Sequence, residues 1–293
     1  MKELKITAPV EISDIDKLKS EAYDKIMADK IVRKFIKEHD IPLSFLTDNL
    51  GLFLRMVEEN EPCCNCKGYQ FCKKVNLQKG YLTFVDSDET IYYEKCKYYK
   101  QFLEKADLYL RRDFEEDKIF LNYDSNDVKD PASKSMYYII IDCIIKKQNL
   151  YVSSKENMDT LTDLIISAVN KTIDKKKVAF VNAVNLKDEV ERYNRYDQDK
   201  LFKLKEELFN CDILVIDSLG SENNSEFFKY SFLIDLITYR NTHHLNTIIS
   251  SYFNLDALEE VYGGYNMRNK TKLLMDKIKE NFQIKEFQTI LRR

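Results

Sequence analysis

Five short apolar runs constrain the fold of the C-terminal half most strongly. They lie between residues 149 and 291 and read NLYV, KVAFVNA, CDILVIDS, NTIISS and IKEFQTIL. Segments long enough for a helix separate them. Runs that are apolar throughout, rather than alternating, are typical of strands covered on both faces. Strands that alternate with helices form a parallel sheet, so the sequence predicts an α/β domain.

The first hundred residues have a different pattern. Residues 13–39 and 43–58 have apolar side chains at helical spacing, and we expect two helices that pack on each other. The alternating run YLTFVDSDETIYYE predicts a β-hairpin that turns at residues 86–89. The sequence therefore predicts a small domain of helices and one hairpin at the N-terminal end.

The boundary between the two domains is predicted from a charged stretch. Residues 97–117 contain few turn-forming residues and are expected to form a connecting helix. We therefore place a helical, cysteine-rich domain at residues 1–105, a linker at 106–130 and the α/β domain at 131–293.

A cysteine cluster lies in the N-terminal part, where five of the seven cysteines fall within 34 residues. Cys63 and Cys66 form a C-x2-C pair, a spacing that brings two thiolates to one tetrahedral ion. The hairpin can return Cys96 beside them, and Cys72 is the candidate for the remaining ligand. Cys64 is left over. The prediction is a structural zinc site, and the alternative is a group of buried apolar thiols.

Glycine is scarce where a phosphate-binding loop would need it. The chain has six glycines, and none lies between Gly80 and Gly220. A GxxxxGK[ST] loop needs two glycines so that backbone N–H groups can approach the phosphates, and GxGxxG is also absent. An intact phosphate loop is excluded, although residues 153–160 join a strand to a helix as such a loop would.

Charge and hydropathy limit the other partners. A net charge of −3 gives no overall attraction to nucleic acid, but YNRYDQDKLFKLK and YGGYNMRNKTK interleave tyrosines with basic residues. This pattern suits base stacking and phosphate contact, so single-stranded DNA is a candidate partner. The most apolar stretch, MYYIIIDCII, is about half of the ~20 residues of a membrane span, and the first 20 residues lack an apolar signal core. We expect a cytoplasmic protein with no membrane partner.

Several segments together resemble the DnaC/DnaI-type AAA+ helicase loaders. They are KIMADKIVRKFIKEHD, the cysteine cluster followed by IYYEKC, DVKDPASKSMYYII, ILVIDSLGSE, TIISSYFNLDAL and KLLMDKI with IKEFQTILRR. The resemblance implies an AAA+ domain that binds ATP and single-stranded DNA. It also implies an N-terminal domain that docks on the hexameric replicative DNA helicase in the primosome. In that domain, the histidine of some family members falls near Leu82.

The family's phosphate loop falls on residues whose chemistry is wrong for phosphate. Its first glycine becomes Ser153, its second becomes Met158, and its lysine becomes Asp159; only Thr160 is kept. A carboxylate in place of the ammonium repels a polyphosphate. ATP and Mg²⁺ are therefore not expected as effective ligands.

Other positions of the family's ATPase site are also changed. Asp217 matches the metal-binding acid, but the second acid becomes Ser218, and the sensor-1 asparagine becomes Tyr252. The sensor-2 arginine becomes Leu273, while Arg268 falls near the position of a trans-acting arginine. Phosphoryl transfer depends on positioning and charge neutralisation, so ATP hydrolysis should be negligible.

The sequence therefore favours a non-catalytic helicase loader or adaptor with a degenerate ATPase site. Other loader or primosomal subunits are possible further partners under this hypothesis. One alternative is an active ATPase loader with an atypical phosphate loop. Another is a module that binds single-stranded DNA.

Overall fold

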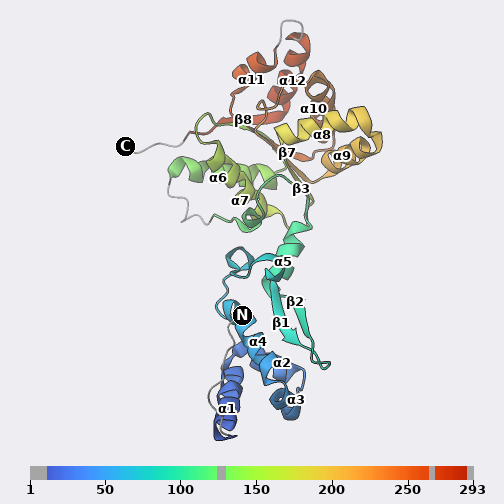
Figure 1. The fold of residues 1–293 in the computed structure, drawn as a ribbon. Helices are drawn as coiled ribbons and strands as arrows, with labels where there is room; N and C mark the ends of the chain where they lie inside the picture. Colours follow the sequence, from blue (N-terminus) through green and yellow to red (C-terminus); the bar gives the residue numbers. More distant parts are fainter. Residues whose placement is uncertain (1–11, 124–129, 264–267, 289–293) are drawn as a thin grey trace, which may run out of the picture. The chain divides into compact units, whose positions relative to one another are not determined.

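The computed structural model describes residues 12–123, 130–263 and 268–288. The chain divides into two compact units, of which the first ends at Leu103 and the second begins at Glu104. Figure 1 shows both units and labels their helices and several of their strands. Each unit is described by itself below.

The first unit contains helices, short 3-10 turns and one hairpin. In chain order they are α1 (Ile12–Ala28), α2 (Lys30–Glu38), α3 (Leu43–Asp48), α4 (Leu50–Asn60), η1 (Glu61–Cys63), η2 (Tyr69–Phe71), η3 (Asn76–Gln78), β1 (Tyr81–Val85) and β2 (Ile91–Lys95); α5 (Lys97–Ala106) begins in this unit.

Each of the two predicted helices is divided in the structure. Asp29 interrupts the first, because its carboxylate accepts hydrogen bonds from the amides of Ile31 and Val32 at 2.8 Å and so begins a new helix. The second breaks at Asn49, between α3 and α4. The helices pack together as predicted, around a core made of Ile26, Val32, Phe35, Leu46, Phe53, Met56, Val57, Phe84 and Val85.

The predicted hairpin is confirmed. Strands β1 and β2 pair antiparallel, with Phe84 opposite Tyr92. At the turn, the amide of Asp86 donates to the carbonyl of Thr90 at 2.8 Å, and Glu89 adopts a φ of 60°. Phe35 of α2 stacks on Phe84 with 4.8 Å between ring centroids, so the hairpin closes one side of the helical core.

The second unit is a parallel α/β domain. Its elements are β3 (Tyr109–Arg112), η4 (Glu116–Phe120), α6 (Pro131–Ile145), β4 (Asn149–Ser153), α7 (Met158–Thr172), β5 (Val178–Asn182), α8 (Ala183–Tyr196), α9 (Gln198–Asn210), β6 (Ile213–Asp217), η5 (Phe228–Phe232), α10 (Leu233–Thr242), β7 (Asn246–Ser251), α11 (Leu255–Tyr262), α12 (Arg268–Asn281) and β8 (Phe282–Glu286). The strand order is β3-β5-β6-β7-β4-β8, and every pairing is parallel. Four predicted strands are present as β4 to β7. The fifth, predicted at residues 284–291, overlaps β8 only at 284–286, and residues 289–291 lie outside the described part of the chain.

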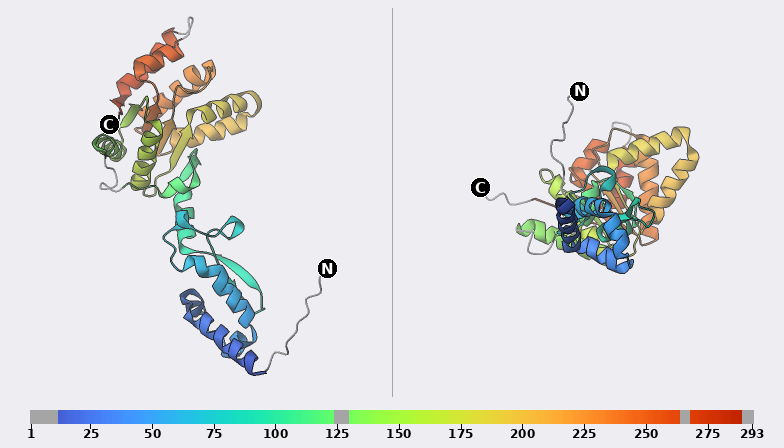
Figure 2. Two further views of the ribbon diagram at one scale, coloured as in Figure 1. Left: turned by 60° about the vertical axis from the view of Figure 1, so that its left-hand side comes forward. Right: turned by 60° about the horizontal axis from the view of Figure 1, so that its bottom comes forward.

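Helices cover both faces of this sheet, with α6 and α7 on one face and α8 to α12 on the other (Figures 1 and 2). Leu214 and Ile216 of β6 pack in the same core as α8 to α12. Ile213 and Val215 are equally buried and face the opposite side, because side chains alternate along a strand. Burial on both faces explains why the runs of β4 to β7 are apolar, whereas β8, at the sheet edge, is mostly exposed. None of the described helices is both long enough and apolar enough to cross a membrane.

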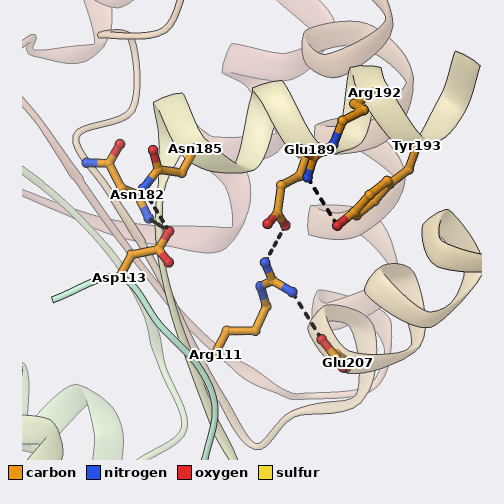
Figure 3. A network of polar contacts seen from close by, with 8 residues as sticks. All are labelled: Arg111, Asp113, Asn182, Asn185, Glu189, Arg192, Tyr193 and Glu207. Carbon is orange, nitrogen blue, oxygen red and sulfur yellow. Dashed lines mark hydrogen bonds and ion pairs between the residues drawn. The ribbon is translucent and has the colours of Figure 1, made fainter. Parts of the chain in front are cut away.

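The structure has a sixth strand, β3, within the segment that the sequence predicts as a linker. Helix α5 ends at Ala106, and β3 then joins the edge of the sheet beside β5. Arg111 of β3 pairs with Glu189 of α8 and lies 3.4 Å from Glu207 of α9, while Asp113 accepts a 2.9 Å hydrogen bond from the amide of Asn182 (Figure 3). The sequence of this strand, YLRR, contains no apolar run that would predict it. Polar contacts of Arg111 and Asp113 hold the strand in place instead.

Candidate functional site

Four cysteines surround one cavity in the first unit. The cavity, of about 290 Å³, is lined by Cys63, Cys66, Cys72 and Cys96 together with Tyr69 and other neighbours. The amide of Cys66 donates to the carbonyl of Cys63 at 3.2 Å, which forms the C-x2-C turn. Two of the thiols thus come from one turn. The other two come from the end of η2 and the end of the hairpin.

Gly80 brings the hairpin end to this cavity. The amide of Cys96 donates to the carbonyl of Gly80 at 2.8 Å. Gly80 has a φ of 84°, and a Cβ there would lie 2.7 Å from the ring of Tyr99. A glycine is required because any side chain would clash and would strain the backbone.

A buried lysine places positive charge beside the thiols. Lys74 is only 6% exposed, and its Nζ donates to Asn60 Oδ1 at 3.1 Å and to the carbonyl of Tyr81 at 2.8 Å. Burial raises the pKa of Cys63 to about 11; Lys74 opposes this shift, and the other three cluster thiols add to it. The Cys63 thiol is therefore influenced both by the Lys74 cation and by the other three thiols of the cavity.

The four thiols are not gathered as metal ligands in the described structure. Within residues 12–123, 130–263 and 268–288, no three His, Cys, Asp or Glu side chains are grouped closely enough to hold a metal ion. Cys66 Sγ donates to the carbonyl of Gly68 at 3.4 Å, and Cys96 Sγ accepts from the amide of Tyr99 at 3.4 Å. Leu82, at the position of the family histidine, also lines the cavity but offers no ligand atom. The arrangement is thus a cavity of free thiols, and the zinc site stays a prediction.

Cys64 faces away from this group, as expected for the cysteine left over. Its Sγ lies 3.4 Å from Asp29 Oδ2, and its side chain is exposed. Cys64 therefore provides a matched control for the four cavity cysteines.

The connector between β4 and α7 has the geometry of a strand–loop–helix site but different chemistry. Ser153 ends β4, and Met158, only 4% exposed, begins α7. Asp159 and Thr160 follow in the first turn and are exposed. A helix N-terminus attracts an anion, and the Asp159 carboxylate already supplies one there.

Asp217 is held by three hydroxyl groups. Its Oδ1 accepts from Thr162 Oγ1 at 2.9 Å and from Ser250 Oγ at 2.6 Å, and its Oδ2 accepts from Ser218 Oγ at 3.0 Å. Asp217 is 7% exposed, and Ser218 has a φ of 61°. Strand order explains why the three hydroxyl groups meet at Asp217. Strand β6 lies beside β7, and β7 lies beside β4, which leads into α7 at the same edge of the sheet. Both carboxylate oxygens are thus engaged within the protein.

The acid just beyond this strand also points inward. Glu222 accepts a hydrogen bond from the amide of Gly220 at 2.8 Å and a short one from the hydroxyl of Tyr262. Burial and then the Glu222 carboxylate raise the pKa of Tyr262 well above its usual value. At Gly220, where φ is 94°, a Cβ would lie 2.6 Å from Leu258 Cδ1. The segment after β6 is therefore fixed by internal contacts.

The remaining predicted nucleotide positions are not gathered with Asp217 by any hydrogen bond or ion pair within the described residues. Tyr252 follows β7 and is 42% exposed, and Leu273 on α12 is 47% exposed. Arg268 begins α12, but its side chain lies outside the described residues.

One tyrosine-rich segment forms a surface hollow where α8 meets α9. The hollow is lined by Arg192, Tyr193, Tyr196, Asp197 and Lys200, and Tyr196 is 81% exposed. The Arg192 guanidinium lies 4.9 Å from the ring centroid of Tyr193, whereas Lys200 pairs with Asp197 at 2.8 Å. Asp197 offsets one of the two positive charges. The second segment, YGGYNMRNKTK, lies partly outside the described residues.

Four polar side chains around these sites have no signal in the sequence. Asn60 and Lys74 are buried beside the cysteine cavity, and Thr162 and Ser250 hold Asp217. Each is an ordinary polar residue in a helix, a strand or a loop. Only the packing of separate elements reveals its place.

Comparison with solved structures identifies the fold. A crystal structure described as DnaI has a TM-score of 0.52 and 18% identity, over 62% of this chain and 98% of that chain. The chain shares its fold with DnaI. The six-stranded parallel sheet confirms the prediction of a parallel α/β domain, while the degenerate phosphate loop and the zinc-binding domain stay predictions.

Two further structures are similar at lower scores. A putative primosome component from Streptococcus pyogenes serotype M3 has a TM-score of 0.49 and 12% identity, over 64% of this chain and 97% of that chain. The DnaC helicase loader has a TM-score of 0.43 and 18% identity, over 58% of this chain and 99% of that chain. No protein-family profile and no curated protein matches the sequence.

Proposed function

We propose that this protein is a loader or adaptor for the replicative DNA helicase and works in the cytoplasm with little or no ATP hydrolysis. The observation that carries this proposal is the fold shared with DnaI. The sequence resemblance to helicase loaders extends to the N-terminal cysteine cluster, so we assign helicase binding to the first unit.

The absence of ATP hydrolysis is inferred from charge and contacts at the connector. Asp159 stands in the first turn of α7, where a bound polyphosphate would need a cation. Coulomb repulsion between carboxylate and phosphate disfavours binding at this point. Asp217, at the metal-binding position, has both oxygens engaged by hydroxyl donors. These two features favour a non-catalytic adaptor over an ATPase with an atypical loop.

We further propose that the cysteine cavity holds a structural zinc ion. Cys63, Cys66, Cys72 and Cys96 supply the four sulfur ligands that a closed zinc site uses. Four thiolates around Zn²⁺ carry a net charge of about −2. Buried Lys74 and the cavity residues Lys34 and Lys97 would offset this charge. The ion would join the C-x2-C turn, the η2 end and the hairpin end.

A binding assay with the helicase of the same organism tests the proposed function. Immobilised full-length protein is expected to retain the helicase, whereas Cys63→Ser is expected to weaken retention by about tenfold or more because the binding unit loses its metal. Cys64→Ser is the matched control and should behave as the wild type. Failure of the wild-type chain to retain the helicase would reject the loader assignment.

A further inference from the structure

The loop that carries Cys72 exposes three large apolar side chains. Phe71 is 60% exposed, Val75 is 69% exposed and Leu77 is 94% exposed. All three lie within seven residues, and we call them the apolar loop face. Single exposed apolar residues are common on proteins, whereas apolar side chains gathered on one short loop are typical of interaction surfaces.

The loop holds a defined shape. Asn76 adopts a φ of 54°, and its carbonyl accepts a 3.2 Å hydrogen bond from the amide of Lys79. Immediately before this turn, Lys74 is buried and is tied by its Nζ to Asn60 and to the carbonyl of Tyr81. Leu77 is therefore presented on a closed turn that Lys74 anchors on its N-terminal side. Little conformational freedom is lost when such a turn binds a partner.

Charge around the apolar loop face has one sign. Residues 67–79 include four lysines and no acidic residue. Lys67 and Lys73 are exposed, and neither forms an ion pair with another described residue. The chain as a whole has a net charge of −3, so this basic loop is a local exception. Its complement is an apolar pocket with carboxylates on its rim.

We propose that the apolar loop face docks into such an acid-rimmed apolar pocket on a protein partner. Building on the proposed function, we infer that the partner is the replicative helicase. Phe71 and Leu77 act as the anchors that enter the pocket, and Lys67 and Lys73 face the carboxylates. Interfaces of this kind depend on a few buried apolar anchors, with charged residues on the rim.

Paired substitutions of exposed residues test this surface. Phe71→Ser with Leu77→Ser should weaken binding of the full-length chain to the helicase by about tenfold or more. Leu18→Ser with Leu43→Ser is the control, because these residues are 60% and 63% exposed in the same unit. A second variant, Lys67→Glu with Lys73→Glu, should slow association most strongly at low salt. Circular dichroism and metal content should be unchanged in all three.

The outcomes separate this inference from the proposed function. If the wild type binds and the apolar and charge variants bind equally well, the loop is not the docking surface, while the loader assignment stands. If the wild type does not bind the helicase, both fail. Light scattering that shows a wild-type dimer, lost in the Phe71 and Leu77 variant, would instead identify a second copy of this chain as the occupant and overturn the proposal.

Discussion

Replacing Cys63 and Cys66 by serine is expected to unfold the first unit and leave the second unit folded. Among the described residues of the first unit, the main core cluster contains nine buried apolar side chains. A structural metal contributes about 10–16 kcal/mol to folding in zinc-finger peptides, so losing two of the proposed ligands should remove a large share of this unit's stability. Thermal unfolding followed by circular dichroism should lose one transition, and metal analysis should show loss of bound zinc.

A control variant and the pH dependence of zinc binding provide two further tests of the zinc site. Cys64→Ser should keep both the transition and the metal, because its thiol points to Asp29 outside the cavity. In the metal-free protein, burial raises the pKa of Cys63 to about 11, so its thiol is protonated at neutral pH. Zinc must displace this proton, and zinc affinity should therefore rise with pH. Retention of the first unit's transition after complete chelation would show that the cysteines only pack as apolar thiols.

Asp217→Ala is expected to lower the free energy of unfolding of the second unit by about 2–4 kcal/mol. The change leaves the hydroxyls of Thr162, Ser250 and Ser218 without their common acceptor in a buried site. Urea denaturation, with the transition assigned to the α/β unit, measures the loss.

The matched control is Asp159→Ala, at the exposed first turn of α7. This variant should change stability by about 1 kcal/mol or less, because only the helix-dipole interaction is removed. A neutral effect of Asp217→Ala would mean that the hydroxyl cluster does not stabilise the fold. It would also remove the main evidence that Asp217 serves to hold the fold together.

The sheet could be predicted from sequence because burial on both faces leaves a direct signal. Strands β4 to β7 are buried at nearly every position and were found, whereas the edge strand β8 is mostly exposed and was predicted with shifted bounds. Strand β3 was missed because ion pairs of Arg111 with Glu189 and Glu207, not an apolar run, hold it at the sheet edge. The division of the first helix was missed for a similar reason, since Asp29 is a local cap in the middle of a continuous helical pattern.

The candidate sites could be predicted in part. Spacing pointed to Cys63, Cys66, Cys72 and Cys96, and the fold places all four around one cavity. The partners of these groups could not be predicted, because Lys74 lies on the same loop as Cys72 and only its tertiary contacts with Asn60 and the Tyr81 carbonyl show that it is buried. The departures from the phosphate-loop pattern at residues 153–160 are likewise visible in the sequence. The hydroxyls around Asp217 depend on strand order instead.

The nucleotide dependence of helicase binding tests the central claim most directly. Affinity of the full-length protein for the helicase, measured with and without millimolar Mg-ATP, should agree within about twofold, because a nucleotide that does not bind cannot shift the equilibrium. Calorimetry of the protein alone with Mg-ATP should show no binding heat. Helicase binding that requires Mg-ATP and is lost in Asp217→Asn would contradict the account and identify an active nucleotide switch.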